Sequence, residues 1–382
     1  NDPTPDEKNG DWAVEQLRAL AATKAKNRKP FFMGVGFIRP HTPLIVPQKF
    51  FDMFPVDKIS LPEILDGDIE DTFAQTIRGL PEGKEPNSER TEDMGSKLFH
   101  KLVESYESRD KALRHFIQAY LASIASVDEQ VGRILDVIDT TELKDNTIIV
   151  LTSDHGWGMG EKDYLYKNSL WQESTRIPLI VRAPGIALAD TTCNRPVSLV
   201  DIYPTLCDLC DLEGDTMKNE KGHPLDGHSF RPLLEDPTNG TWTGPGEALT
   251  ALYKWRMKYD PHEESYALRS SDWRYIRYEN GKEELYNTAS DPNEWENLAT
   301  KTKHEARIQR FRQTLASRLP EKGVVPPQPQ WKAPGKPEPK SNEYWKDLYF
   351  KKNPDADADK DGTLSWPELQ AHKKAVAEKA PQ

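Results

Sequence analysis

The strongest constraint on the fold is residues 111–156, in which a long helical pattern is followed by a short β-branched run. Apolar side chains recur every three or four positions over 111–139, which predicts a long helix with one buried stripe. The run TIIVLTSDHG at 147–156 then predicts a buried strand that ends in polar residues. Sites in open α/β sheets gather at the carboxyl ends of strands, so Asp154 and His155 are candidate functional residues.

Other segments extend this α/β pattern. An amphipathic helix is predicted over 12–28, and the runs FFMGVGFI at 31–38 and IPLIVRAPG at 177–185 predict further buried strands. Residues 55–95 are polar and rich in Pro, Gly and Asp, which indicates an irregular surface segment. The sheet that we expect is therefore assembled from strands separated by helices and long loops.

The pattern changes after about residue 250. Three short strand-like runs (YALR, WRYIRY and ELYN), the last two joined by an Asn-Gly turn, precede a helical segment at 303–318. Six prolines then occupy 326–339, which indicates a stiff linker. The expected organisation is an α/β domain at 1–250, an α+β antiparallel-sheet subdomain at 251–325, a linker at 326–341 and a helix-loop-helix tail at 342–382.

Composition excludes some functions. The net charge of −11 argues against a nucleic-acid partner, and no apolar run approaches the roughly 20 residues of a membrane span. Of three cysteines, Cys207 and Cys210 share one face of a predicted helix, with no second pair or histidine nearby to complete a zinc site. We expect them to be buried packing residues. The chain starts at Asn1 rather than Met, so we expect a processed form or a fragment.

The tail carries a calcium-loop pattern. Residues 357–368, DADKDGTLSWPE, fit the twelve-residue EF-hand loop, with Gly362 at the sharp turn. A register that starts at Asp355 competes, but it would put Lys360 at the glycine position. The predicted calcium ligands are Asp357, Asp359, Asp361, Thr363 (through its carbonyl), Ser365 and Glu368.

Several motifs in one order resemble a known family. RPHTP follows the FF-containing run, SDHGW is followed by Gly-Glu and then by Lys167, twelve residues after His155, and LDGHSFRPLL and ELYNTASDPNEWENLA come later. This order resembles the sulfatases of the alkaline-phosphatase-like superfamily, and within them the iduronate-2-sulfatase branch. The resemblance runs, with gaps, from about residue 12 to 318, and it implies a three-layer α/β sandwich.

The resemblance also implies residue roles. Asp154 and His155 correspond to two ligands of an active-site divalent cation, with calcium expected; because His is an unusual ligand for a hard cation, contact of His155 with sulfate stays open. Lys167 corresponds to a sulfate-binding residue, and His41 to one that reaches the sulfate and the leaving-group oxygen. Sulfatases use a formylglycine made in a C/S-x-P-S-R motif, which is absent from the 382 residues. We therefore expect no nucleophile, no activity of this chain alone, and a sheet without its N-terminal strands.

The sequence thus predicts a calcium-dependent sulfuric ester hydrolase that acts on sulfated polysaccharide or glycosaminoglycan. Two alternatives remain open: a phosphonate or phosphate ester hydrolase of the same superfamily, and a non-catalytic, calcium-dependent glycan-binding remnant. The resemblance and the use of calcium imply a periplasmic or secreted protein. The sequence does not determine the sugar, the linkage or the oligomeric state.

Overall fold

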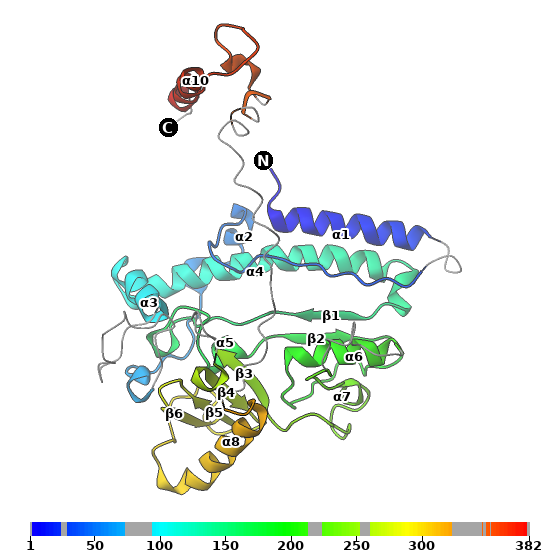
Figure 1. Cartoon of the computed structure of the whole chain (residues 1–382), viewed down its shortest axis with the longest axis vertical. Coiled ribbons are helices and arrows are strands. Elements are labelled where there is room, and N and C mark those ends of the chain that lie inside the picture. The colour runs from blue at the N-terminus through cyan, green and yellow to red at the C-terminus, as the bar shows by residue number, and fades with distance from the viewer. Residues whose placement is uncertain are drawn as a thin grey trace. The chain divides into compact units, whose positions relative to one another are not determined.

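The computed structural model describes residues 2–23, 29–72, 94–212, 224–252, 260–322, 346, 349–351 and 353–379 (Figure 1). The chain divides into two compact units, Asn1–Val324 and Val325–Gln382. The predicted linker at 326–341 lies outside the described residues. The strands and most helices belong to the first unit, which therefore holds every candidate residue except those of the calcium loop.

Two helices form the upper layer of the first unit in Figure 1. Helix α1 (Pro5–Ala22) begins with a capping box between Thr4 and Glu7, and α4 (Arg109–Asp139) confirms the predicted long helix. The helices lie side by side because each offers an apolar stripe. Their shared core comprises Val14, Leu17, Val137, Ile138 and Leu143.

The prediction of a buried strand at 31–38 is wrong. These residues are extended, and from Met33 onward half-buried and exposed positions alternate, but they have no ladder partner among the described residues. Met33 packs against the α1–α4 core, whereas the Phe32 side chain is 86% exposed. A strand needs a neighbour for its backbone groups, so period-two geometry alone does not make one.

The two strands near the candidate site form a small antiparallel sheet. Strand β1 (Ile149–Thr152) pairs with β2 (Leu179–Arg182), with Ile149 opposite Arg182. Both strands are half-buried rather than buried, and Ile180 is 61% exposed. Arg182 contacts Asp139 at 2.5 Å, which ties β2 to the end of α4.

The predicted antiparallel meander is confirmed and has one strand more than expected. Strands β3 (Ala248–Leu252), β4 (Ser265–Arg269), β5 (Trp273–Arg277) and β6 (Glu283–Asn287) pair in sequence order. The Ala-rich β3 run carries a weak strand signal, because alanine favours helix. Helix α8 (Glu305–Arg318) packs on the sheet, where Phe311 stacks on Tyr275 with ring centres 5.4 Å apart.

The remaining helices are short. They are α2 (Gln48–Asp52), α3 (Met94–Glu104), α5 (Gln172–Thr175), α6 (Ile202–Leu209) and α7 (Arg231–Glu235) in the first unit and α10 (Trp366–Lys379) in the second. Single 3₁₀ turns are η2 (Val56–Lys58), η3 (Asp68–Asp71), η4 (Glu142–Asp145), η5 (Glu161–Asp163), η6 (Leu199–Asp201), η7 (Pro261–Glu263), η8 (Thr302–His304) and η9 (Pro354–Ala356). No helix in the described ranges is both long and apolar enough to cross a bilayer.

The cysteine prediction is also wrong. Cys207 lies on α6 and is half-buried, whereas Cys210 follows the last helical residue, Leu209, and is exposed. Cys193 is half-buried, and all three are free thiols.

Candidate active site

His41 and Lys167 meet although 126 positions separate them in the sequence. The Lys167 Nζ atom lies 3.2 Å from His41 Nε2, and His41 Nδ1 lies 2.6 Å from the Thr42 carbonyl oxygen. An ammonium only donates and a carbonyl only accepts, so these contacts fit a neutral imidazole with its proton on Nδ1. The Nε2 lone pair then faces the lysine and accepts from its ammonium.

Asp154 and His155 lie just beyond the end of β1. The Asp154 side chain is 84% exposed; its Oδ1 accepts the His155 backbone N–H at 3.0 Å, and its Oδ2 lies 3.5 Å from His155 Nε2. His155 Nδ1 lies 2.8 Å from the Gly156 carbonyl oxygen. The carboxylate and the imidazole are therefore adjacent and available to a ligand.

A glycine-rich ladder brings the Lys167 segment back to the end of this strand. Gly156 N–H donates to the Ser174 carbonyl (2.9 Å), and Gly158 N–H donates to the Tyr166 carbonyl (2.9 Å). A Cβ at Gly156 would lie 2.0 Å from the Glu173 carbonyl oxygen, so this close approach requires glycine. The residues between His155 and Lys167 thus form a loop that leaves the end of β1 and returns to it.

Lys162 belongs to this loop, and its side chain is buried. Its Nζ donates to Asp68 Oδ1 (2.8 Å) and to the Glu294 carbonyl (2.5 Å), and both ion-pair partners are almost fully buried. Burial raises the pKa of Asp68 to about 6, although Lys162 opposes that shift. The pair joins η5, in the active-site loop, to η3.

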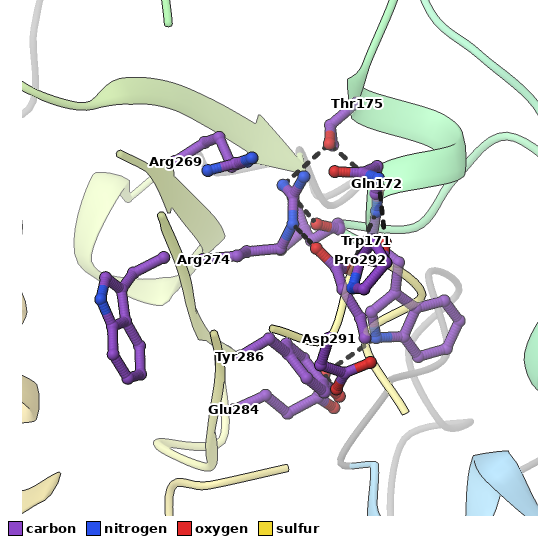
Figure 2. Close-up of polar contacts among 12 residues, drawn as sticks. Trp171, Gln172, Thr175, Arg269, Arg274, Glu284, Tyr286, Asp291 and Pro292 are labelled. Atoms are coloured by element: carbon purple, nitrogen blue, oxygen red, sulfur yellow. Dashed lines mark hydrogen bonds and ion pairs between the residues drawn. The ribbon is translucent and has the colours of Figure 1, made fainter. Parts of the chain in front are cut away.

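A second buried network joins the segment after Lys167 to the meander (Figure 2). Arg274, on β5, pairs with Glu294 and donates to Thr175 Oγ1 at 2.8 Å. Glu294 Oε2 also accepts the Gln172 backbone N–H at 3.0 Å. The arginine and the glutamate are 1% and 0% exposed, so the contact is shielded from water.

Glu284, on β6, is the other buried carboxylate of this contact. Its oxygens accept hydrogen bonds from Trp171 Nε1 (2.8 Å) and from the hydroxyls of Tyr278 (2.9 Å) and Tyr286 (2.9 Å). Burial, and after it proximity to this carboxylate, raises the pKa of both tyrosines. These residues were not predicted from the sequence, where charged positions inside the apolar runs WRYIRY and EELYN are the available signal.

Glu173 completes this polar layer. Burial first, and then the charges of Glu294 and Glu161, raise its pKa to about 7. Glu161 itself accepts the Met159 N–H at 2.6 Å, and burial raises its pKa. Glu173 and Glu161 therefore titrate closer to neutral pH than exposed carboxyls do.

The structure brings the four predicted residues of the active site together as two pairs, His41 with Lys167 and Asp154 with His155. Within the described part of the chain, no third carboxylate, imidazole or thiol joins Asp154 and His155 closely enough to complete a three-ligand group. A cation there would need further ligands. Among the same described residues, Asp357, Asp359 and Asp361 form one group of three carboxylates whose oxygens lie close enough together to hold a metal ion.

Hydrogen bonds within the loop at 357–368 involve several of the predicted calcium ligands. Gly362, at φ +86°, donates its N–H to Asp357 Oδ2 (2.9 Å), and Thr363 N–H donates to Asp361 Oδ1 (2.7 Å). Glu368 accepts the N–H groups of Ala358 and Ser365, both at 2.9 Å. Hydrogen bonds from Ser365 are the largest cause that lowers the pKa of Glu368 to about 2.

Two observations favour the register that starts at Asp357. Asp357 Oδ1 is buried without a hydrogen-bond partner, as expected of a carboxylate oxygen that serves as a cation ligand. Asp355, the start of the competing register, instead has its Oδ2 3.2 Å from His372 Nε2. The small core beside the loop comprises Ala356, Leu364 and Leu369.

Comparison with known proteins gives the family. The family model described as Sulfatase matches residues 3–212, and that of the C-terminal part of N-sulphoglucosamine sulphohydrolase matches 160–321. The chain belongs to the sulfatase family.

The relatives are longer than this chain. A sulfatase of Formosa agariphila is 32% identical over 314 residues, which cover 81% of this chain and 53% of that protein. Human iduronate 2-sulfatase is 32% identical over 218 residues, 53% of this chain and 34% of the enzyme. The chain spans about half the length, or less, of these curated relatives.

Solved structures support the α/β fold of the sulfatases. A protein in complex with its substrate D-glucosamine-2-N,6-O-disulfate has a TM-score of 0.62 at 22% identity and covers 83% of this chain and 69% of that one. The phosphonate monoester hydrolase of Agrobacterium radiobacter has a TM-score of 0.59 at 24% identity, with coverages of 81% and 60%.

Proposed function

We propose that the protein to which this chain belongs is a sulfuric ester hydrolase that removes sulfate from sulfated carbohydrates. The observation that carries the proposal is the 3.2 Å contact between His41 and Lys167, because both lie inside the matched sulfatase region. Two cationic or protonatable groups at one point suit a small anion better than they suit a structural role on an exposed surface.

The chemistry fits these two side chains. Sulfuryl transfer moves negative charge onto the peripheral oxygens and the leaving-group oxygen. Lys167 stabilises the peripheral charge, and His41, when its Nε2 also carries a proton, donates that proton to the departing alkoxide. Both contributions are larger in the transition state than in the bound substrate, as catalysis requires.

The nucleophile is not among the residues of this chain. No Cys or Ser in the 382 residues begins C/S-x-P-S-R. A formylglycine, in the family, supplies the attacking oxygen as an aldehyde hydrate. We therefore propose that this polypeptide alone binds a sulfate ester without turning it over.

A sulfated sugar is the favoured substrate class. Relatives include an N-acetylglucosamine-6-O-sulfatase of Bacteroides thetaiotaomicron, 30% identical over 208 residues, as well as the iduronate 2-sulfatases. A phosphonate or phosphate ester hydrolase is the alternative, and the likeness to phosphonate monoester hydrolases favours it at the level of fold. A non-catalytic, calcium-dependent glycan-binding remnant is the third candidate.

Product release separates these candidates. In the full-length gene product, Lys167→Ala is expected to lower kcat/KM for an aryl sulfate by about 10²-fold, because one charge-stabilising group is lost. Exposed Lys144→Ala is the matched control and should keep the rate. Faster release of phosphate than of sulfate would favour the alternative hydrolase, and binding of sulfated glycan without release of either anion would overturn the hydrolase proposal.

Calcium at the active site is part of the proposal. Asp154 offers an exposed carboxylate and His155 an imidazole beside it, which fits two ligands of a larger set. Bound there, calcium would supply positive charge next to the sulfate oxygens. The contribution of the chain's own residues is to keep the two donors adjacent at the end of β1.

We also propose a calcium ion in the loop 357–368, and this proposal is independent of catalysis. Glu368→Gln is expected to weaken calcium binding by the whole chain at least tenfold, because the last position of such a loop supplies a bidentate carboxylate. Calorimetric titration measures the affinity. Asp355→Asn is the control: it should leave the affinity unchanged, and a loss as large as that of Glu368→Gln would instead place the register at Asp355.

The proposed location is periplasmic or secreted. Support comes from the predicted use of calcium in two places and from the sulfated-carbohydrate substrates named for relatives. Fractionation of the native source, with the protein followed by antibody, tests the location.

A further inference from the structure

Asp6 anchors the loop that carries His41. It lies in the first turn of α1, its residue is 3% exposed, and its Oδ1 and Oδ2 accept the backbone N–H groups of Ile38 (2.7 Å) and Arg39 (3.0 Å). A buried carboxylate that accepts two backbone N–H groups is a strong, directional anchor, since hydrogen bonds to a charged group are stronger than neutral ones.

This anchor acts on a segment of the backbone that has no ladder partner among the described residues. Residues 29–38 have no ladder partner among the described residues, so the end of the extended segment is not held by a sheet. Asn9, one turn further along α1, donates to the Gly36 carbonyl at 2.8 Å. Helix α1 therefore replaces a neighbouring strand as the partner of this segment.

The backbone segment that Asp6 anchors continues directly into the turn that carries His41. His41 N–H donates to the Ile38 carbonyl at 2.9 Å, so the residue held by Asp6 also begins the turn. The Arg39 guanidinium then donates to the His41 and Ile45 carbonyls, each at 3.2 Å, and closes the loop. The side chain of His41 is exposed, so its orientation depends on these backbone contacts rather than on packing.

We propose that Asp6 is a positioning residue for His41, which fixes the loop so that Nδ1 meets the Thr42 carbonyl and Nε2 faces Lys167. The catalytic meaning of that orientation rests on the proposed sulfatase function. The orientation itself is a property of this chain and can be measured without turnover.

The test is NMR of the whole chain. In the wild type, long-range ¹H–¹⁵N correlation of the His41 ring is expected to show the proton on Nδ1. Asp6→Ala should produce a mixture of the two neutral forms, and the Ile38 and Arg39 amides should exchange with solvent at least tenfold faster. Asp6→Asn, which keeps the shape and one carbonyl acceptor, should give intermediate values for both readouts.

Asp11→Ala is the matched control. Asp11 lies on the same helix, is exposed and pairs with Arg133 at 2.5 Å, so its loss removes a carboxylate from α1 without touching the loop. An unchanged His41 tautomer in Asp6→Ala would overturn the proposal, even with faster amide exchange. Where Asp6→Ala does not fold, Asp6→Asn decides by the same readouts. Full activity of a His41→Ala enzyme would instead overturn the assigned role of His41 and leave the anchor intact.

Discussion

Arg274→Met is expected to destabilise the first unit by about 3–5 kcal/mol, the cost of leaving one partner of a buried ion pair alone. Arg274 is 1% exposed and Glu294 is 0% exposed, so the remaining carboxylate cannot regain water. The substitution also removes the donor to Thr175 Oγ1, which lies at the end of α5. Urea denaturation, followed by tryptophan fluorescence, measures the change in the free energy of unfolding.

Arg310→Met is the control for this prediction. Arg310 pairs with Glu247 at 3.2 Å, but its side chain is 64% exposed, and such pairs contribute about 0–1 kcal/mol. The double variant Arg274→Met/Glu294→Gln should recover part of the loss, because a neutral amide costs less to bury than a carboxylate. Equal, small effects of Arg274→Met and Arg310→Met would show that the buried network does not hold the meander to the active-site segment.

The second large effect is a dependence of stability on pH. The folded-state pKa of Glu173 is about 7 against an ordinary value of 4.5, so the folded chain keeps a proton that the unfolded chain releases over this range. The stabilising contribution of this carboxyl is therefore fully present below about pH 4.5 and is lost as the pH rises to about 7. Asp68, with its pKa raised to about 6, has the same sign over a lower window.

Glu173→Gln isolates this contribution. Near pH 4.5 the variant and the wild type should have similar free energies of unfolding, and at pH 7.5 the variant should be more stable by about 3 kcal/mol, since each pKa unit corresponds to about 1.4 kcal/mol. Thermal unfolding at a series of pH values measures the difference. Glu15→Gln, an exposed change on α1, is the control. A difference that does not grow with pH contradicts the assigned pKa.

Local pattern predicted much of the fold. The apolar stripe of α4 is long enough to be unambiguous, and the Asn-Gly turn between β5 and β6 is a specific signal. The same reasoning failed for 31–38, because an apolar run indicates an extended segment but does not supply the neighbour that makes it a strand. It failed also for Cys210, which is exposed although it lies three residues after the half-buried Cys207.

The candidate-site residues likewise fall into those that the local sequence places together and those that only the fold brings together. Asp154 and His155 are neighbours in the sequence, and the residues of the loop 357–368 are close in sequence, so spacing alone places each group together. By itself, the sequence determined the long helix α4, the turn between β5 and β6 and the motif order that indicates a sulfatase. Only the tertiary structure decided that His41 meets Lys167, that Asp6 holds the His41 loop, and that Arg274 pairs with Glu294 beneath the site. Those contacts join distant segments through burial and shared hydrogen bonds, and no local periodicity encodes which buried donor faces which acceptor.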